Sequence, residues 1–202
     1  MIQDQKNKIS NEISHLDDAL KQLGFKRHCV HVGPLIRREA EYSHLSVGER
    51  FKILGKILTF AFYVDFLYKT FVVEKRHLQG EAELSFKLAK QIADFIRNNY
   101  NFFLSYDKIK IYYDNGQTWV TRIVVTVFSE FLNQIEFRKA FQKDYKLAQV
   151  ADLVCTATLI DLKMKNKSLS RSELRFFGNE RNINKIFLKQ IKKKEFERRN
   201  KT

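Results

Sequence analysis

Residues 108–141 read KIKIYYDNGQTWVTRIVVTVFSEFLNQIEFRKAF, and this stretch decides the fold class. Residues 108–114 predict a strand, which the Asn115-Gly116 turn stops. The Val and Thr residues of 118–132 favour a strand, but the apolar positions recur at helical spacing, so we predict a helix there. Residues 135–141 alternate weakly, which is typical of an edge strand. The stretch therefore predicts a strand, a helix and a second strand.

Further elements are expected on both sides of this stretch. The expected helices cover residues 9–23, 46–63, 80–105, 145–160 and 179–199, and the expected short strands cover 28–32 and 65–75. Ser46 with Glu49 matches a capping box, and Gly33-Pro34 predicts a turn into a short helix. Strands separated by long helices predict an α/β fold with an at least partly parallel sheet. We expect a single α/β domain over residues 1–202, of which about 163–202 form a basic helical region.

The composition excludes several classes of protein. No apolar run approaches the roughly 18–20 residues of a membrane span, and the first residues lack the apolar stretch of a secretory signal. Cys29 and Cys155 form neither a metal-ligand spacing nor a disulfide framework. We therefore expect a cytoplasmic protein in a reducing environment, without a membrane partner.

The formal charge of +14 is concentrated near the end of the chain. Residues 163–202 contain 14 Lys and Arg residues against 4 Asp and Glu residues. A basic face of this size attracts nucleic acid, because neutralised phosphates release counterions; an ordinary solvated helix face is the alternative. The candidate contacts with nucleic acid are Arg37, Arg38, Arg171, Lys192, Lys193 and Lys194.

Asp152 is a charge within the apolar segment YKLAQVADLVCTATLI, residues 145–160. On a helix, small or polar residues surround it and apolar residues cover most of the remaining circumference. The carboxylate therefore points either through a narrow solvent window or into a cleft. In a cleft it requires a cation, a metal ion or several donors, because an isolated buried carboxylate is too costly.

Asp114 is a second candidate carboxylate, at the end of the strand predicted over residues 108–114. Ligands and catalytic groups gather at such strand ends in open α/β sheets. Two carboxylates are suitable ligands for Mg²⁺ or Mn²⁺, and paired ions can drive phosphodiester cleavage. The alternative is that Asp114 only forms the turn with Asn115-Gly116.

Five segments occur in the same order and at similar spacing in a bacterial and phage family. They read VHVGPLIRREAEY, FVVEK, IYYDNG, LAQVADLVC and LSRSELRFFG. Over about residues 4–194 the chain therefore resembles the family called domain of unknown function 3800, whose members look similar to the ribonuclease H-like superfamily. The resemblance implies an RNase H-like mixed sheet flanked by helices, with an acidic cluster that binds divalent metal and acts on nucleic acid.

The resemblance also implies roles for individual residues. Asp114 matches the acid at the strand end and Asp152 the acid on the helix, which together would bind Mg²⁺ or Mn²⁺. His31, Lys75 and Gln149 match further family positions and would orient water or phosphate. The alternatives are a hydrogen-bonded core or surface position for His31 and a surface position for Lys75.

One feature departs from the family, whose members begin with a strand carrying an Asp-Glu-Ser-Gly-like motif. Here Met1 directly precedes the helix that should follow that strand. We therefore expect an RNase H-like fold without its first strands. The chain is then a truncated product, receives the strands from elsewhere, or is not catalytic.

Three functions follow from these patterns. The first is a metal-dependent, nuclease-like phosphodiesterase using Asp114 and Asp152, and the second is a non-catalytic module that binds nucleic acid or a partner chain. The third is an assembly protein that forms a homodimer through the helix of residues 9–23. Its apolar seam consists of Ile9, Ile13, Leu16, Leu20 and Leu23.

Overall fold

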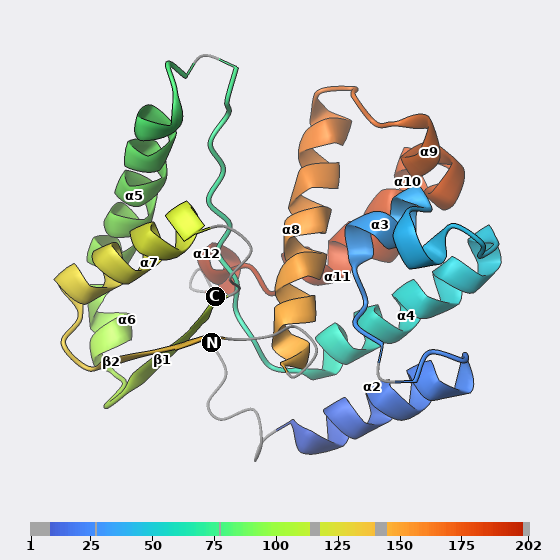
Figure 1. Cartoon of the computed structure of the whole chain (residues 1–202), viewed down its shortest axis with the longest axis horizontal. Helices are drawn as coiled ribbons and strands as arrows, with labels where there is room; N and C mark the ends of the chain where they lie inside the picture. Colours follow the sequence, from blue (N-terminus) through green and yellow to red (C-terminus); the bar gives the residue numbers. More distant parts are fainter. Residues whose placement is uncertain (1–8, 27, 77, 114–117, 140–144, 200–202) are drawn as a thin grey trace. The chain divides into compact units, whose positions relative to one another are not determined.

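The computed structural model describes residues 9–26, 28–76, 78–113, 118–139 and 145–199 (Figure 1). It confirms a mixed α/β protein, mostly helical (66%), with a two-stranded parallel sheet in the part described. The chain divides into two compact units. The sheet unit is Phe71–Asp144, and the helical unit combines Met1–Thr70 with Tyr145–Thr202.

The sheet unit contains the predicted strand–helix–strand arrangement. Strands β1 (Ile109–Tyr113) and β2 (Ile135–Lys139) pair in parallel, and α7 (Thr118–Phe131) connects them. Parallel neighbours need such a crossover because the chain must return to the same end of the sheet. The predicted order of strand, helix and strand is therefore confirmed, whereas Asp114, the predicted turn at Asn115-Gly116 and residues 140–141 lie outside the described residues.

Two further helices complete the core of the sheet unit. Helix α5 (Glu81–Asn98) packs along α7, and α6 (Tyr100–Leu104) follows after a break at Asn99. The single helix predicted over residues 80–105 is thus two helices. Their shared core contains Ile92, Ala93, Ile96, Phe103, Val127 and Leu132.

The helical unit contains the remaining elements. They are α2 (Ser10–Gln22), α3 (Val32–Arg37), the 3₁₀-helix η1 (Ala40–Tyr42), α4 (Val47–Tyr63), α8 (Lys146–Lys165), α9 (Arg171–Phe177), α10 (Glu180–Asn182), the π-helix η2 (Ile183–Leu188), α11 (Lys189–Lys192) and α12 (Phe196–Arg199). The predicted capping box of α4 is confirmed: Ser46 Oγ accepts from the N–H of Glu49, whose carboxylate accepts from the N–H of Ser46. Ser170 and Glu173 form a second box on α9.

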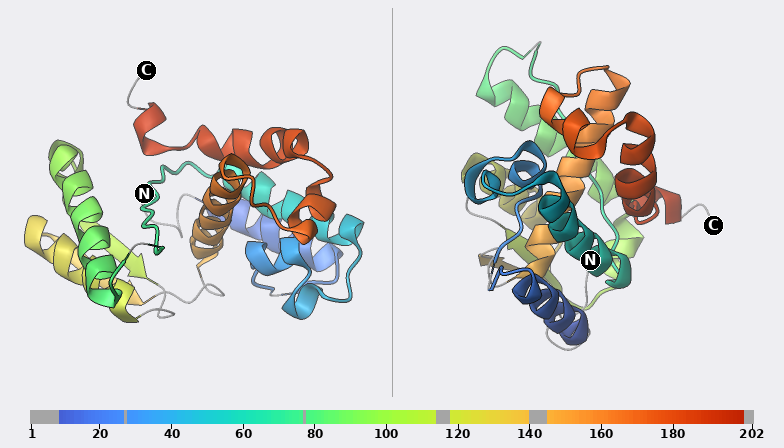
Figure 2. Two further views of the ribbon diagram at one scale, coloured as in Figure 1. Left: turned by 90° about the horizontal axis from the view of Figure 1, so that it is seen from above. Right: turned by 90° about the vertical axis from the view of Figure 1, so that its right-hand side faces the viewer.

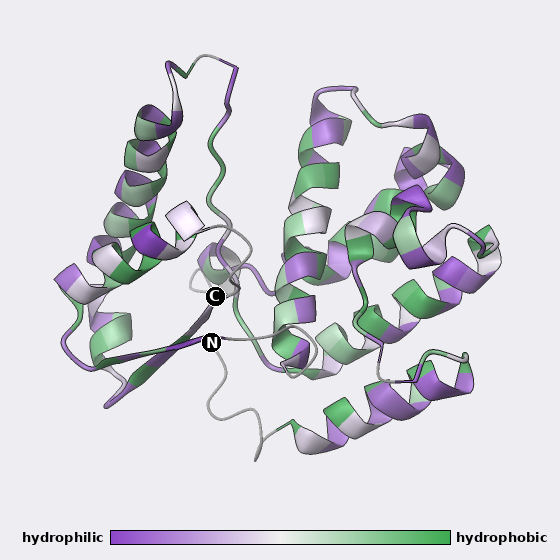
Figure 3. Ribbon diagram, viewed as in Figure 1, coloured by the Kyte–Doolittle hydropathy of each residue, from purple (hydrophilic) through white to green (hydrophobic). Residues whose placement is uncertain are grey.

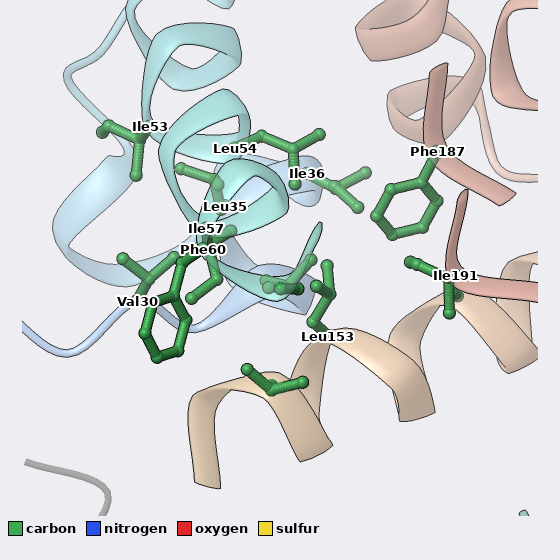
Figure 4. Packing of buried hydrophobic residues seen from close by; sticks show 14 of the residues in the cluster. Val30, Leu35, Ile36, Ile53, Leu54, Ile57, Phe60, Leu153, Phe187 and Ile191 are labelled. Atoms are coloured by element: carbon green, nitrogen blue, oxygen red, sulfur yellow. The ribbon is translucent and has the colours of Figure 1, made fainter. Parts of the chain in front are cut away.

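One apolar core joins the helices of this unit. Hydrophobic residues lie along α4 and α8 (Figure 3), and the two additional directions of Figure 2 show α4, α8 and η2 in one helical group. In Figure 4, Leu153 of α8 points toward α3 and α4, and Phe187 of η2 points toward Ile36. All three side chains are at most 1% exposed. Burial of each such side chain stabilises the fold by about 1.5–3 kcal/mol.

The apolar seam of α2 is part of this core. Leu16 and Leu20 are buried, and Ile13 and Leu23 pack against the same cluster. Helix α2 lies against α4, and Gly24 follows with a φ of 88°, which glycine adopts readily. The seam of residues 9–23 is thus occupied within the chain itself.

Two predicted strands are wrong. Residues 28–31 join no strand among the residues described, and Val32 already belongs to α3; side chains accept hydrogen bonds from the backbone N–H groups of Val30, His31 and Val32. Residues 65–75 form only an isolated bridge, between Tyr68 and Glu195. The N–H of Tyr68 donates to the carbonyl oxygen of Lys194. The β-branched and aromatic residues of 65–75 favour a strand, but within the described residues this segment pairs with other backbone only at Tyr68.

Two helix predictions also need correction. The turn predicted at Gly33-Pro34 lies inside α3, which begins one residue earlier. The single basic helix predicted over residues 179–199 is divided into α10, η2, α11 and α12. Residues 193–195 separate α11 from α12, because Lys194 and Phe196 pair with the backbone of Tyr68 instead of continuing a helix.

Candidate functional site

Two side chains of α8 hold the extended segment that precedes α3. Gln149 and Asp152 are three residues apart, and therefore lie on one face of the helix. Gln149 Oε1 accepts a 3.0 Å hydrogen bond from the N–H of Val30, and Asp152 Oδ2 accepts a 2.8 Å bond from the N–H of Val32. The N–H of His31, between them, donates to the Tyr42 hydroxyl. Side chains thus replace the partners that a strand would have.

The bond from Val32 explains the charge on α8. Val32 is the first residue of α3, and the side chain of its N-cap, His31, makes no capping hydrogen bond. Asp152 therefore supplies the missing acceptor from another helix, and its negative charge is favourable beside a helix N-terminus. The carboxylate is half-buried. One oxygen of the Asp152 carboxylate therefore makes a structural contact with the start of α3.

The neighbourhood of Asp152 contains charges of both signs. A hydrogen bond from Arg37 Nε to Glu39, 2.8 Å long, raises the pKa of Arg37, and Glu173 and Asp152 add to that rise. Burial and then Asp152 raise the pKa of the Cys155 thiol. A positive guanidinium and a neutral thiol therefore accompany the carboxylate.

The structure brings three of the predicted catalytic residues together in the helical unit. The side chains of Gln149 and Asp152 bind the 28–32 segment, and His31 lies within it and donates its backbone N–H to Tyr42. Lys75 is exposed in the sheet unit, and Asp114 lies outside the described residues.

The residues described do not make a metal site by themselves. Mg²⁺ and Mn²⁺ require several oxygen ligands, yet within the described ranges no group of three His, Cys, Asp or Glu side chains converges. One oxygen of Asp152 already accepts from a backbone N–H. The pairing of Asp114 with Asp152 around a metal ion stays a prediction.

Four of the predicted phosphate ligands have partners within the chain. Arg37 pairs with Glu39, and Arg38 Nε donates to the carbonyl oxygen of Ser43. Lys192 pairs with Asp161 at 2.5 Å, and Lys194 donates to the carbonyl oxygens of Phe62 and Val64. These side chains have structural roles. Arg171 and Lys193 are exposed and make no ion pair with the residues described.

The buried Glu173 and the partly buried Asp161 neutralise several cations of the C-terminal region. Lys163 binds Glu173 at 2.7 Å, and Lys165 shares Asp161 with Lys192. The cations that remain are exposed and have no ion pair within the described ranges. They are Lys167, which lies between α8 and α9, and six further cations: Arg171 and Arg175 of α9 (the α9 pair), and Arg181, Lys185, Lys189 and Lys193 (the basic row).

The basic row lies opposite a buried apolar face. Residues 181–193 contain no Asp or Glu. Ile183, Phe187, Leu188 and Ile191, which alternate with the row, are at most 5% exposed. The core therefore fixes this stretch, and the charged side chains that it leaves exposed are all positive.

The π-helix helps to keep the basic row straight. At 3.6 residues per turn, positions four apart drift steadily around an α-helix. The π-helix η2 has hydrogen bonds from residue i to residue i+5 and therefore more than four residues per turn. Residues four apart are thus rotated around η2 in the sense opposite to their rotation around an α-helix. The two drifts compensate along α10, η2 and α11.

Sequence reasoning missed four of these six cations, namely Arg175, Arg181, Lys185 and Lys189. The signal that could have found the row is the spacing of four residues from 181 to 193 without an intervening acid. Phe62 and Tyr63, two exposed aromatic side chains at the end of α4, were also missed.

No family model matches the chain, and no curated protein and no solved structure is significantly similar to it. The resemblance to the domain of unknown function 3800 therefore stays a prediction. Among the described residues, no helix combines the length and the apolar character that crossing a membrane requires.

Proposed function

We propose that the helical unit binds the phosphate backbone of nucleic acid through the basic row and the α9 pair. The observation that carries the proposal is the set of six exposed cations that have no ion pair among the residues described. Soluble surfaces usually intersperse both signs of charge, whereas the helix of residues 181–193 presents only one. Phosphates would neutralise this face and release counterions, which drives binding.

A salt titration tests the proposal. Fluorescence anisotropy with labelled oligonucleotides measures the association constant between about 50 and 200 mM salt, the range over which phosphate contacts weaken strongly. Six phosphate contacts predict a slope of log K against log salt of about −4 to −5. The absence of binding at the lowest salt concentration would contradict the proposal.

Two triple variants separate the basic row from general charge. Replacement of Lys185, Lys189 and Lys193 by Gln should reduce the magnitude of the slope by about 2–3. The control replaces Lys21, Lys26 and Lys52, which are also exposed and lie outside the row. Both variants lower the formal charge by three. Equal losses of affinity in both variants would show that net charge, rather than the row, is responsible.

A second candidate function is metal-dependent cleavage by an RNase H-like fold. The resemblance of IYYDNG and LAQVADLVC to the family supports it, together with the position of His31 and Gln149 near Asp152. Millimolar Mg²⁺ or Mn²⁺ with labelled DNA and RNA tests for cleavage. Asp152→Asn should then abolish cleavage and leave the salt-dependent binding intact. Activity that persists in this variant would remove Asp152 from the site.

A further inference from the structure

Two aromatic side chains are exposed side by side at the end of α4. Phe62 is 53% exposed and Tyr63 is 68% exposed. Their rings meet edge to face, with centroids 5.2 Å apart and an interplanar angle of 84°. Neighbouring large aromatic side chains in water are unfavourable unless they serve an interaction. The pair is therefore a candidate contact for a flat, apolar ligand group.

Lys194 ties this aromatic pair to the end of the basic row. Its ammonium donates a 2.9 Å hydrogen bond to the carbonyl oxygen of Phe62 and a second bond to that of Val64. The same ammonium lies 4.9 Å from the centroid of the Phe66 ring. A cation at the C-terminal carbonyl groups of α4 is favourable because the helix dipole is negative there. Lys193, the last cation of the row, is the adjacent residue.

The aromatic pair and the basic row therefore belong to one region of the helical unit. Helices α4 and α11 contact each other, and they lie side by side in Figures 1 and 2. The three later cations of the row succeed one another at about 6 Å intervals if the rise is helical, and Lys194, next to the last of them, binds the carbonyl oxygen of Phe62. A charged track that ends at exposed rings is the arrangement by which proteins bind unpaired strands.

We propose that the helical unit binds single-stranded nucleic acid, with phosphates along the basic row and unpaired bases stacked on Phe62 and Tyr63. This inference rests on the proposed function and narrows its ligand. A duplex offers the same phosphates, but its bases are already stacked on one another and cannot reach the rings. Single-stranded DNA and RNA share the required chemistry, since both have a charged backbone and accessible base faces.

Binding to four labelled ligands tests the inference: a 20-residue oligo(dT), the equivalent oligo(U), and a DNA and an RNA duplex of the same length. Wild-type protein should prefer the single strands over both duplexes by about tenfold or more. Phe62→Ala with Tyr63→Ala should weaken single-strand binding about ten- to a hundredfold and leave the salt slope unchanged. Comparison of oligo(dT) with oligo(U) shows which sugar is preferred.

A matched control uses another exposed Phe and Tyr. Phe86 (68% exposed) and Tyr100 (41% exposed) lie in the sheet unit, and their replacement by Ala should leave single-strand affinity unchanged. Circular dichroism verifies that each double variant is folded. Should the Phe62/Tyr63 variant fail to fold, photocross-linking of wild-type protein to 5-iodouracil oligonucleotides gives a second readout, with adducts expected on Phe62 or Tyr63.

The outcomes separate this inference from the proposed function. Equal affinity for strands and duplexes, with the aromatic variant unchanged, would overturn the inference and leave phosphate-backbone binding intact. Cross-links that avoid both aromatic residues would also overturn it. If wild-type protein bound none of the four ligands at low salt, the proposed function itself would be refuted.

Discussion

The carboxylate of Asp152 accepts a hydrogen bond from the backbone N–H of Val32, 120 residues earlier in the chain. The bond joins the middle of α8 to the first turn of α3, and it explains a charge that the sequence places among apolar residues. The same helix face supplies Gln149 to Val30. These contacts give Asp152 and Gln149 a structural role that is measurable independently of any activity.

Removal of the Asp152 side chain should destabilise the protein. Asp152→Ala leaves the Val32 N–H without its charged acceptor, and we expect a loss of about 1–3 kcal/mol in the free energy of unfolding. Asp152→Asn keeps an oxygen acceptor but loses the favourable charge near α3, which should cost about 0.3–1 kcal/mol. Urea denaturation measures both values. An Ala variant as stable as wild type would refute the capping role.

Replacement of Gln149 should destabilise the protein as much as replacement of Asp152, although Gln149 carries no charge. It is fully buried, and its Oε1 accepts from the N–H of Val30. Gln149→Leu keeps the apolar volume but leaves a buried N–H unsatisfied, at an expected cost of about 1–3 kcal/mol. The control Gln190→Leu, at an exposed position of α11, should change stability by no more than about 0.5 kcal/mol. Urea denaturation midpoints compare the two variants.

Arg50 should be essential for the joint between α3 and α4. Arg50 as a whole residue is 3% exposed. Its guanidinium donates hydrogen bonds to the carbonyl oxygens of Leu35 and Ile36, at 2.8 and 2.9 Å. It also lies over the Phe176 ring. Arg50→Met leaves both carbonyl groups without this donor, and we expect a loss of about 2–4 kcal/mol. Thermal unfolding followed by circular dichroism measures it; an unchanged midpoint would be inconsistent with this role.

His28 should make stability depend on pH near neutrality. Burial lowers its pKa below the ordinary 6.5, against an opposing contribution from Glu41. The unfolded chain therefore binds this proton more readily than the folded chain. The contribution of His28 to stability is complete above about pH 6.5 and is lost as the pH falls through the lowered pKa. Unfolding free energies at about pH 7.5 and 5.5 measure the loss.

Variants at two histidines isolate this effect. His28→Gln should flatten the pH dependence between those two conditions, because the titrating group is gone. His15 is exposed on α2, and His15→Gln should leave the dependence as it is in wild type. A His28→Gln variant that keeps the full pH dependence would assign it to another group.

The sequence predicts the helices and the small sheet where apolar residues recur at helical or strand spacing over a long stretch. In α7, strand-favouring Ile123, Val124 and Val127 form a helix because their spacing places them on the face that packs into the core. Residues 28–32 and 65–75 were mistaken for strands because composition does not reveal where backbone N–H groups find acceptors. For Val30 and Val32 the acceptors are side chains of a distant helix.

The candidate site is predictable only in part, because the sequence does not show which cations form ion pairs in the folded chain. The net positive charge of the C-terminal region is evident from the sequence. Which cations are available depends on the directions of Asp161 and Glu173, which neutralise Lys163, Lys165 and Lys192. Only the folded chain shows that Lys185 and Lys189 form no ion pair with the residues that the structure describes.

The helical unit is assembled from the two ends of the chain, with the sheet unit between them. During synthesis on a ribosome, the chain emerges at about 5–20 residues per second. The acceptors for Val30 and Val32 would thus emerge roughly ten seconds after these donors. Until then, the apolar faces of α2, α3 and α4 lack their α8 partner, and a chaperone that shields α4 during this interval would raise the yield of native protein.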